Sequence, residues 1–434
     1  MKQVVILAGG EGTRLKKVSG SLPKPMVLIH GKPLLQYLIE QCVKYDFLDV
    51  HLLVSYKSDK ISDYFGSGRR YGVSITYHVE NVPRGTAGAL LDIFPHLNDV
   101  FLVLYGDTFF DIDLGKFWDF HLKKKGDVSL FLHPNDHPAD SDLVSMNNDL
   151  RITNIYGYPH DGKWRRNLVN AALYVFSKKN ICNINLPLDR PDIAKNLFPL
   201  LVKSGRELYG YLSTEYIKDM GTPERLKKIE NDVKSGKVKS LRLASKKKAL
   251  FLDRDGVINK EVDHLNKLDQ LVLIDNIGKA IRKINQAGVL AVVVTNQPVI
   301  ARGELSNSDL QDIHNKLDTL LGLEGAYIDR VYYCPHHPDK GFKNEVKELK
   351  IDCDCRKPKP GLLLQAAKEM NISLQDSWLV GDSSGDILAG KQAGVKTILV
   401  KTGYGGTDMK YRVRPDLIAD NLLAAVKGIL KDAK

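Results

Sequence analysis

Two loops that are far apart in the sequence each place phosphate-binding residue types directly behind a short apolar run. The first is LAGGEGTRL at residues 7–15, followed by LPKP at 22–25, and the second is FLDRDG at residues 251–256. In open α/β sheets, ligands gather at the carboxyl ends of the strands, so each loop marks a ligand site. The sequence therefore predicts two α/β domains, each of which begins with a phosphate site.

Length and composition set the outer limits. A chain of 434 residues allows about two or three domains, and 43% hydrophobic with 26% charged residues is typical of a globular protein. No apolar run approaches the ~20 residues of a membrane span, and the first residues do not resemble a signal peptide. Five cysteines, three of them within residues 334–355, argue against a disulfide framework. We expect a cytoplasmic protein.

The net charge of +11 is concentrated in one run. Residues 234–248 contain seven Lys or Arg and no acid, which leaves +4 for the rest of the chain. A solvated basic linker explains the run, and small polyanionic substrates explain the remainder. We therefore expect no nucleic-acid and no membrane partner, and the sequence is compatible with a homo-oligomer.

Apolar runs alternate with helix-like periodic segments, which predicts βαβ units and a parallel sheet in each half. We predict one domain at 1–232, a basic linker at 233–247 and a second domain at 248–434. The predicted strands are 4–8, 50–54, 73–77, 100–105, 249–252, 289–294, 331–333, 378–380 and 397–400. The predicted helices include 33–47, a segment starting near 222, 277–287, 308–321, 361–370, 386–393 and 419–430.

The Gly-Gly-x-Gly-Thr-Arg-Leu loop with Pro-Lys-Pro ten residues later resembles the sugar-1-phosphate nucleotidyltransferases, over about residues 1–232. Their fold is a Rossmann-like glycosyltransferase-A fold. The resemblance continues in VENVPRGTAGALL (79–91), FLVLYGDTFFDIDL (101–114), LVNAALYVF (168–176) and YIKDMGTPE (216–224). It implies transfer of a nucleotide to a sugar phosphate, with release of pyrophosphate.

The same resemblance implies roles for individual residues. Asp107 and Asp219 would hold Mg²⁺, Arg14 and Lys24 would act on the reacting phosphates, and Asn170 would bind the sugar substrate. The residues implied in nucleotide binding are Leu7, Gly9, Gly10, Gly12, Thr13, Arg14, Gly85, Thr86 and Asp107.

Two departures from the family pattern concern this domain. Tyr105 stands where an Asn is common, and the Phe-x-Glu-Lys that supplies a sugar-phosphate lysine is missing. Lys163, Arg165 or Arg166 is a candidate replacement, and a solvated basic loop is the alternative interpretation. The sequence Gly-Thr-Ala-Gly at 85–88 is most similar to guanylyltransferases, which favours GTP as the nucleotide.

In the second half, acidic, hydroxyl and basic groups follow successive apolar runs. Asp253 and Asp255 are two residues apart on one strand and share a face, so both can reach one phosphorus atom. Thr295 and Asn296 follow the next run, Arg356 and Lys357 follow Cys355, and Asp382 and Asp386 lie in GDSSGD. The paired carboxylates suit a two-step phosphate hydrolysis with one nucleophile and one acid/base.

This order resembles the haloacid-dehalogenase-like phosphatases over about residues 248–405. The resemblance makes Asp253 the nucleophile and Asp255 the acid/base. It implies Mg²⁺ on Asp253, on the backbone carbonyl of Asp255 and on Asp382. The residues implied in substrate binding are Thr295, Asn296, Arg356 and Lys357.

Cys334-x-His336 and Cys353-x-Cys355 form a third group. Three thiolates and one imidazole fill a tetrahedral zinc and leave no open position, so we predict a structural Zn²⁺ that fixes the adjoining Arg356 and Lys357. Free thiols in a polar loop are the alternative.

The motifs YCPHHP (333–338) and CDCRKPKPG (353–361) are similar to the heptose 1,7-bisphosphate 7-phosphatases, with the histidinol-phosphate phosphatases as close relatives. A heptose phosphate links the two domains, because removal of the distal phosphate leaves the sugar 1-phosphate that a guanylyltransferase accepts. The alternatives are a histidinol-phosphate-type phosphatase with a mannose or glucose nucleotidyltransferase, a DNA-end phosphatase, and a first domain that only binds nucleotide.

Overall fold

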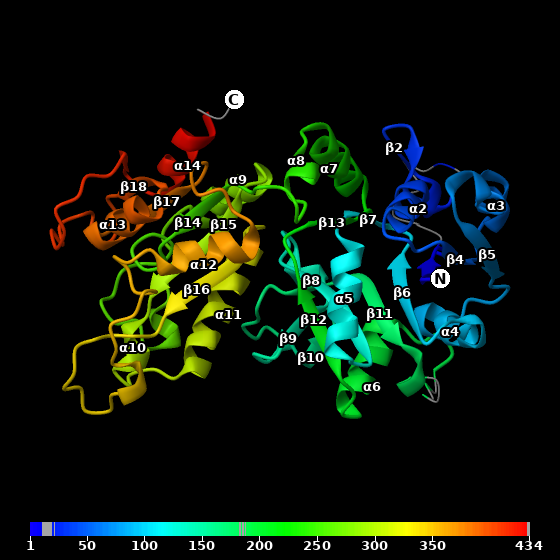
Figure 1. Ribbon diagram of the computed structural model, residues 1–434, viewed down its shortest axis with the longest axis horizontal. Coiled ribbons are helices and arrows are strands. Elements are labelled where there is room, and N and C mark those ends of the chain that lie inside the picture. The colour runs from blue at the N-terminus through cyan, green and yellow to red at the C-terminus, as the bar shows by residue number, and fades with distance from the viewer. Residues whose placement is uncertain (11–19, 21, 182–183, 185, 187, 432–434) are drawn as a thin grey trace. The chain divides into compact units, whose positions relative to one another are not determined.

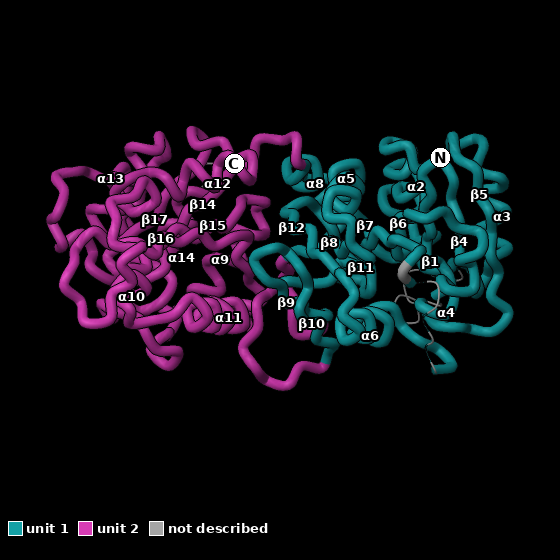
Figure 2. Tube along the Cα trace, turned by 60° about the horizontal axis from the view of Figure 1, so that its bottom comes forward, with its two compact units in different colours: residues 1–133, 141–158, 168–242 teal, residues 134–140, 159–167, 243–434 magenta. Residues whose placement is uncertain are grey.

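The chain folds into two compact α/β units, as the sequence predicted (Figures 1 and 2). The computed structural model describes residues 1–10, 20, 22–181, 184, 186 and 188–431. Unit 1 consists of Met1–His133, Ser141–Tyr158 and Leu168–Arg242. Unit 2 consists of Pro134–Asp140, Pro159–Asn167 and Leu243–Lys434, so it includes two short segments from the first half of the sequence.

Unit 1 is built on a mixed sheet. Its parallel part has the order β6-β1-β4-β5, with β1 in the interior; these strands are β1 (Gln3–Leu7), β4 (Asp49–Val54), β5 (Ser74–Val79) and β6 (Val100–Tyr105). The sheet continues with β8 (Val128–His133), β9 (Leu143–Met146), β10 (Ile152–Tyr156), β11 (Val169–Ser177) and β12 (Leu208–Leu212). The predicted parallel strands are therefore present, and because β11 runs antiparallel to both β6 and β8, the whole sheet of this unit is mixed.

The helices of unit 1 and two small hairpin-like sheets surround this sheet. The helices are α2 (Leu34–Lys44), α3 (Ser58–Phe65), α4 (Gly85–Asp92), α5 (Leu114–Lys124), α6 (Phe198–Lys203), α7 (Pro223–Lys234) and α8 (Lys237–Ser240). The short pairs are β2 (Leu28–Ile29) with β3 (Lys32–Pro33), and β7 (Thr108–Asp111) with β13 (Tyr216–Asp219). Helix α7 begins as its sequence predicts: Thr222 accepts from the Arg225 N–H, and Pro223 occupies the first turn.

One apolar core of unit 1 joins strands that are distant in the sequence. Val5, Phe101 and Phe176 are buried in it together with Ala87 and Leu90 of α4. Helix α4 therefore packs on the sheet beside the end of β1, where the glycine loop begins.

Unit 2 is a six-stranded parallel sheet with the order β16-β15-β14-β17-β18-β19. The strands are β14 (Ala249–Leu252), β15 (Leu290–Asn296), β16 (Arg330–Cys334), β17 (Trp378–Gly381), β18 (Lys396–Val400) and β19 (Leu417–Ala419). The helices are α9 (Ile277–Gln286), α10 (Pro298–Ala301), α11 (Asn307–Leu323), α12 (Gly361–Met370), α13 (Ser384–Ala393) and α14 (Leu422–Lys431). Residues 417–419 form the edge strand β19, so the helix predicted from residue 419 begins later.

Two layers of helices enclose this sheet. Apolar residues of α9, α11 and α14 form one buried cluster with Leu250 and Leu252 of the central strand. Phe251 and Leu379 are also completely buried, and side chains alternate along a strand, so they face the opposite layer. Helices α12 and α13 contact strands β15–β18 outside the first cluster. Because β14 is central and buried on both faces, the residue that follows it is held on a rigid element.

The basic segment 233–247 differs from the predicted solvated linker. It contains the end of α7 and the whole of α8, and Arg242 forms an ion pair with the buried Asp111 at 2.6 Å. Asn371 donates to the carbonyls of Leu243 and Ser245, and Lys247 is buried. These contacts order the segment, so its charge is neutralised in part by the protein.

Among the described residues, no helix combines the length and the apolar character that crossing a membrane requires.

Candidate active sites

The DRDG loop of unit 2 lies at the carboxyl end of the central strand β14. The Asp253 N–H donates to the Val380 carbonyl of β17 at 3.0 Å, which fixes the first residue after the strand. Gly256 has φ +75°, and a Cβ there would collide with the carboxylate of Asp382. Glycine is therefore required where the loop passes the Asp382 side chain.

Three carboxylates converge at this edge of the sheet. Ligand oxygens of Asp253, Asp382 and Asp386 all lie within 4.8 Å of one another. Burial raises the pKa of Asp253 to about 7, with Asp386 adding to the effect and Lys357 opposing it. Burial, followed by repulsion from Asp386 and Asp253, raises the pKa of Asp382 to about 9. Hard oxygen donors that repel one another in this way fit a divalent cation such as Mg²⁺.

The buried ammonium group of Lys357 neutralises part of this charge. Its Nζ lies 2.8 Å from Asp253 Oδ1 and 2.6 Å from Asp386 Oδ1, and it also donates to the Val294 carbonyl at 2.8 Å. These nearby carboxylates raise the pKa of Lys357 although burial alone would lower it. A permanent cation thus lies beside the two carboxylates.

Asp255 is held apart from the three carboxylates. Arg254, which is completely buried, donates from Nη2 to both of its oxygens at 2.9 and 2.8 Å and from Nε at 3.1 Å. The side-chain amides of Gln297 and Asn259 donate to it at 3.0 and 2.8 Å. These donors fix the orientation of the Asp255 side chain. Magnesium binding through the Asp255 backbone carbonyl stays a prediction.

The other predicted substrate residues surround the Lys357 loop. Asn296 donates to the Lys357 carbonyl and accepts from the Lys357 N–H, both at 3.0 Å. Thr295 is buried and accepts from Gln297 Nε2 at 2.9 Å. Arg356 donates to the carbonyl of His336 at 3.3 Å. The structure thus brings these predicted residues to one edge of the sheet, and their contact with substrate stays a prediction.

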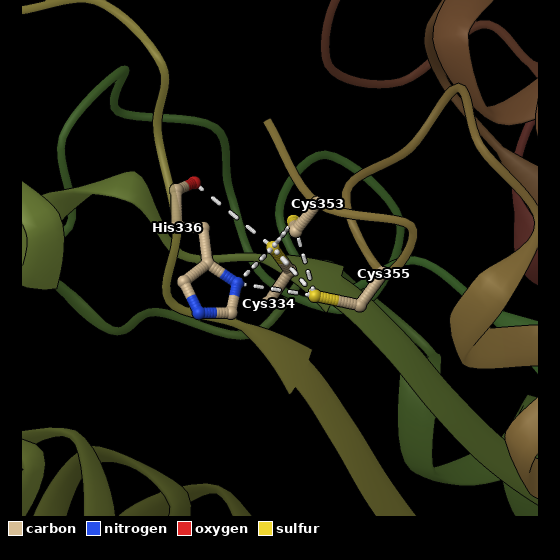
Figure 3. Close-up of side chains that lie close together, drawn as sticks. All are labelled: Cys334, His336, Cys353 and Cys355. Atoms are coloured by element: carbon tan, nitrogen blue, oxygen red, sulfur yellow. Dashed lines mark hydrogen bonds between the residues drawn. The ribbon is translucent and has the colours of Figure 1, made fainter. Parts of the chain in front are cut away.

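The four Cys and His side chains of the third motif point toward one another (Figure 3). The Sγ atoms of Cys334, Cys353 and Cys355 are 3.2–3.5 Å apart, and His336 Nδ1 lies 3.3 Å from Cys355 Sγ. These separations are far longer than the ~2.05 Å of a disulfide, and all four ligand atoms lie within 4.8 Å. The group therefore has the composition and the compactness of a tetrahedral metal site.

In unit 1, the predicted glycine loop leaves β1 at Leu7. A Cβ on Gly9 would lie 3.3 Å from Glu80 Oε2, and Gly10 has open space. Gly12, Thr13 and Arg14 lie outside the described residues. Lys24 is largely buried and forms an ion pair with Asp107. Lys24, which is predicted to bind phosphate, is therefore paired with Asp107, which is predicted to bind magnesium.

The backbone brings Asp107 and Asp219 next to each other. Strand β13 pairs with β7, so that Asp219 lies opposite Thr108, and the Met220 N–H donates to the Asp107 carbonyl at 2.8 Å. Arg225 Nη1 donates to Asp219 Oδ1 at 2.6 Å. Each of the two carboxylates is therefore paired with a cation, and their joint binding of Mg²⁺ stays a prediction.

Gly85 and Thr86 begin α4 and support a neighbouring loop. Gly85 has φ +71°, and a Cβ there would lie 2.5 Å from the Pro191 carbonyl oxygen. The Thr86 hydroxyl donates to Asp192 Oδ2 at 2.9 Å and accepts from the Ile193 N–H at 2.9 Å. These contacts give both residues a structural role besides the predicted nucleotide binding.

Asn170 and Tyr105 lie on the strands beside α4. The side-chain oxygen of Asn170 accepts from the Ala172 N–H at 3.3 Å, at a register shift in β11. Tyr105 ends β6, and burial raises the pKa of its phenol. It therefore replaces the usual Asn as a neutral, partly buried group.

The candidate lysine and arginines of DGKWRR are not part of unit 1. Residues 159–167 belong to unit 2, where the Arg165 N–H donates to Thr319 Oγ1 at 2.9 Å. These residues thus group with the phosphatase unit, and Arg165 packs on α11; the role of Lys163, Arg165 or Arg166 toward a sugar phosphate stays a prediction.

Comparison with known proteins finds a family for each half of the chain. A family profile described as nucleotidyl transferase matches residues 3–236, and one described as HAD-hydrolase-like matches residues 354–425. The chain belongs to the nucleotidyl transferase family.

The phosphatase part has relatives of its own. The chain is 47% identical over 159 residues to the D-glycero-beta-D-manno-heptose-1,7-bisphosphate 7-phosphatase of Pasteurella multocida, which covers 36% of this chain and 83% of that protein. It is 42% identical over 161 residues to a D-glycero-alpha-D-manno-heptose-1,7-bisphosphate 7-phosphatase of Photorhabdus laumondii, which covers 37% of this chain and 86% of that protein. The chain therefore also belongs to this phosphatase family.

Among solved structures, HddC from Yersinia pseudotuberculosis is 31% identical and covers 54% of this chain and 100% of its own, with a TM-score of 0.47. The family profile of residues 3–236 and the phosphatase relatives show that this nucleotidyl transferase is an enzyme with a transferase part and a phosphatase part.

Sequence reasoning missed several residues of both parts of this nucleotidyl transferase. Asp386 was noted in GDSSGD but not as a predicted metal ligand, although it follows Asp382 by only four residues and lies in the first turn of α13. Gln297 follows Thr295 by two residues, a spacing that places both on one face. Arg225, which binds Asp219, carried no signal that separates it from an exposed helix cation.

Proposed function

We propose that this chain performs two neighbouring steps in the synthesis of a GDP-heptose. Unit 2 removes the 7-phosphate of D-glycero-D-manno-heptose 1,7-bisphosphate, and unit 1 transfers GMP from GTP to the resulting heptose 1-phosphate. The product is GDP-D-glycero-α-D-manno-heptose. The observation that carries the proposal is the buried group of Asp253, Asp382 and Asp386 with Lys357 bridging two of them.

In the phosphatase step, Asp253 attacks the 7-phosphorus and forms an aspartyl-phosphate while the sugar alkoxide leaves. Asp255 donates a proton to that alkoxide and then removes one from the water that hydrolyses the intermediate. Arg254, Gln297 and Asn259 fix the orientation of the Asp255 side chain for both proton transfers. Lys357 lowers the repulsion between the nucleophile and the anionic phosphate.

Two metals fit the donor sets of unit 2. Asp253, Asp382 and Asp386 would hold Mg²⁺, which supplies charge neutralisation at the phosphoryl group when bound. Cys334, His336, Cys353 and Cys355 would hold Zn²⁺ in a closed, structural site. Because Cys355 directly precedes Arg356 and Lys357, a metal on its thiolate would fix the position of both cations.

In the transferase step, an oxygen of heptose 1-phosphate attacks the α-phosphorus of GTP and pyrophosphate leaves. Lys24 supplies a positive charge to the reacting phosphates, and Asp107 and Asp219 would bind Mg²⁺. Arg225 holds Asp219 in place. The glycines after β1 allow the backbone to approach the nucleotide.

The heptose assignment is supported by the chemistry of the pair and by the phosphatase relatives. A 7-phosphatase leaves a sugar 1-phosphate, which is the acceptor that a nucleotidyl transferase needs. Histidinol, the product of a histidinol-phosphate phosphatase, is not a sugar 1-phosphate and cannot serve as that acceptor. The phosphatase relatives carry both α- and β-heptose names. We assign the α-anomer because the resemblance of unit 1 to guanylyltransferases implies GDP-D-glycero-α-D-manno-heptose as the product.

The test supplies purified full-length protein with heptose 1,7-bisphosphate, GTP and Mg²⁺, and follows orthophosphate and pyrophosphate separately. Orthophosphate should appear first, and pyrophosphate release should require either that step or added heptose 1-phosphate. Histidinol phosphate and mannose 1-phosphate serve as competing substrates for the two units. Faster turnover of either competitor, or no pyrophosphate from GTP and heptose 1-phosphate, would contradict the proposal.

A further inference from the structure

The long loop that follows β18 holds a candidate cation ligand of the phosphatase site. Residues 401–416 join β18 to β19 without a helix or a strand, and connections of this length are usually functional. The Tyr404 N–H donates to Asp382 Oδ2, and the Gly406 N–H donates to the Asp382 carbonyl, both at 2.7 Å. The loop therefore fixes the backbone and one carboxylate oxygen of Asp382, which is only 2% exposed.

The loop that follows β14 contacts Asp382 from the other side. In the sheet, β17 lies between β14 and β18, and Asp382 directly follows β17 (Figure 1). Gly403 and Gly256 have φ +61° and +75°, and a Cβ on Gly403 would collide with Asp382 Oδ2 and lie 2.6 Å from Gly256 Cα. The two loops therefore meet backbone to backbone across the end of β17 and enclose the Asp382 side chain.

A side chain joins the two loops a second time. The Tyr404 hydroxyl donates to Asp263 Oδ1 at 2.9 Å, and we call this hydrogen bond the latch. Asp263 is held in place by Glu261, whose Oε1 accepts from the N–H groups of Val262 and Asp263 at 2.9 and 2.6 Å. Tyr404 is 41% exposed and Asp263 is exposed, so the latch can open locally while the core stays folded.

The second part of the same loop is tied to α13. Asp408 accepts from the Ser384 N–H at 2.8 Å and from the Ser384 hydroxyl at 2.5 Å, and the Tyr411 N–H donates to Ser384 Oγ at 3.0 Å. None of these bonds involves the two residues of the latch. Loss of the latch would therefore free only the part of the loop that contacts Asp382, and the rest would stay attached to α13.

Tyr404 thus contacts Asp382 through its backbone and Asp263 through its side chain. We propose that Tyr404 is a positioning residue for the cation of the phosphatase: the latch joins the loops after β14 and β18 and keeps the Tyr404 N–H on Asp382. Groups that orient a metal ligand in this way raise the metal affinity, because the ligand is held in its binding orientation before the cation arrives. The inference rests on the proposed Mg²⁺ site of unit 2, and it does not depend on which sugar is the substrate.

The test compares Tyr404→Phe, which removes the hydroxyl and keeps the ring and the N–H, with the matched control Tyr411→Phe in the same loop. Mn²⁺ binding to the substrate-free, full-length protein is measured by electron paramagnetic resonance, and the binding that is lost in Asp382→Asn is assigned to unit 2. Tyr404→Phe should raise the Kd of this site about tenfold, and Tyr411→Phe should leave it unchanged. The Mg²⁺ concentration for half-maximal hydrolysis of p-nitrophenyl phosphate should rise by the same factor, with kcat at saturating Mg²⁺ within about twofold of the wild type.

Substitutions of Asp263 test the latch from its other end. Asp263 has φ +57°, a conformation that Asn tolerates and that Gly adopts without strain. Asp263→Asn keeps an acceptor for the Tyr404 hydroxyl and should bind Mn²⁺ like the wild type. Asp263→Gly removes the acceptor and should match Tyr404→Phe, and the double variant should bind no more weakly than either single variant, to within about twofold.

Wild-type Mn²⁺ affinity in Tyr404→Phe, additive losses in the double variant, or an equal loss in Tyr411→Phe would each overturn the inference. Unchanged Mn²⁺ binding in Asp382→Asn would contradict the proposed cation site itself and the inference with it, and this result is distinguishable because it involves no latch variant. Equal urea midpoints of the Tyr404→Phe and Tyr411→Phe proteins would show that a general loss of stability does not cause the difference in affinity.

Discussion

At the scale of single residues, unit 2 divides its acidic groups by environment. Asp253, Asp382 and Asp386 repel one another in a buried cluster, whereas Asp255 is surrounded by donors from Arg254, Gln297 and Asn259. The first environment favours a cation and the second favours a fixed carboxylate. Four aspartate side chains thus acquire different roles through their neighbours.

Asp253→Asn should abolish orthophosphate release, with a loss of at least about 10³-fold, because an amide is a poor nucleophile. The same variant should release pyrophosphate at the wild-type rate when heptose 1-phosphate and GTP are supplied. Asp107→Asn is the reciprocal variant and should lose only pyrophosphate release. Loss of both activities in either variant would show that the two sites are not independent.

Gln297→Leu should lower phosphatase kcat by about tenfold while KM stays nearly constant, because Asp255 loses one of its donors and Thr295 loses its partner. Thr295→Val, which removes the second contact and the predicted substrate contact of Thr295 but keeps the Gln297 donor to Asp255, is the comparison variant and separates the effects. An equal loss in both variants would place the effect at Thr295 and not at Asp255.

At the scale of elements, the strands that carry the sites were predictable and the surroundings were not. Strand β14 was predicted at its observed bounds, because a four-residue apolar run before DRDG has few other interpretations. The Cys and His group was also predictable, because closely spaced Cys and His residues are the usual ligands of a structural zinc ion. The antiparallel pairing of β8 with β11 was not predictable, because tertiary contacts decide which strands pair. Tertiary contacts also decide that residues 159–167 belong to unit 2, so the sequence did not predict this assignment.

Gly256→Ala should remove most phosphatase activity through the turn that follows β14. Its φ of +75° costs a residue with a Cβ about 1–2 kcal/mol, and the added methyl group would meet the Asp382 carboxylate. Gly428→Ala on α14, where nothing lies within 4 Å of an added Cβ, is the control and should leave activity intact. Orthophosphate release by a G256A protein at more than half the wild-type rate would contradict this account of the turn.

At the scale of the whole molecule, a magnesium site is predicted in each unit, whereas the predicted zinc ligands all belong to unit 2. A chelator that strips Zn²⁺ while Mg²⁺ stays in excess should reduce orthophosphate release and leave pyrophosphate release unchanged, because the four Cys and His ligands belong to unit 2. Zinc content measured by atomic absorption should be one per chain and should fall in Cys355→Ser. Parallel loss of both activities on chelation would contradict a metal site confined to unit 2.

Acid should destabilise unit 1 through a histidine that folding keeps neutral. His121 is 1% exposed between the hydroxyls of Ser129 and Ser177, and burial lowers its pKa to about 4. The unfolded chain, with an ordinary histidine pKa of about 6.5, binds the proton first as the pH falls. The free energy of unfolding of unit 1 should therefore be constant above pH ~6.5 and decrease between ~6.5 and ~4, by up to roughly 3 kcal/mol. Urea midpoints at pH 7.5 and 5.0, compared between wild type and His121→Gln, isolate this contribution; equal pH dependence in both proteins would exclude it.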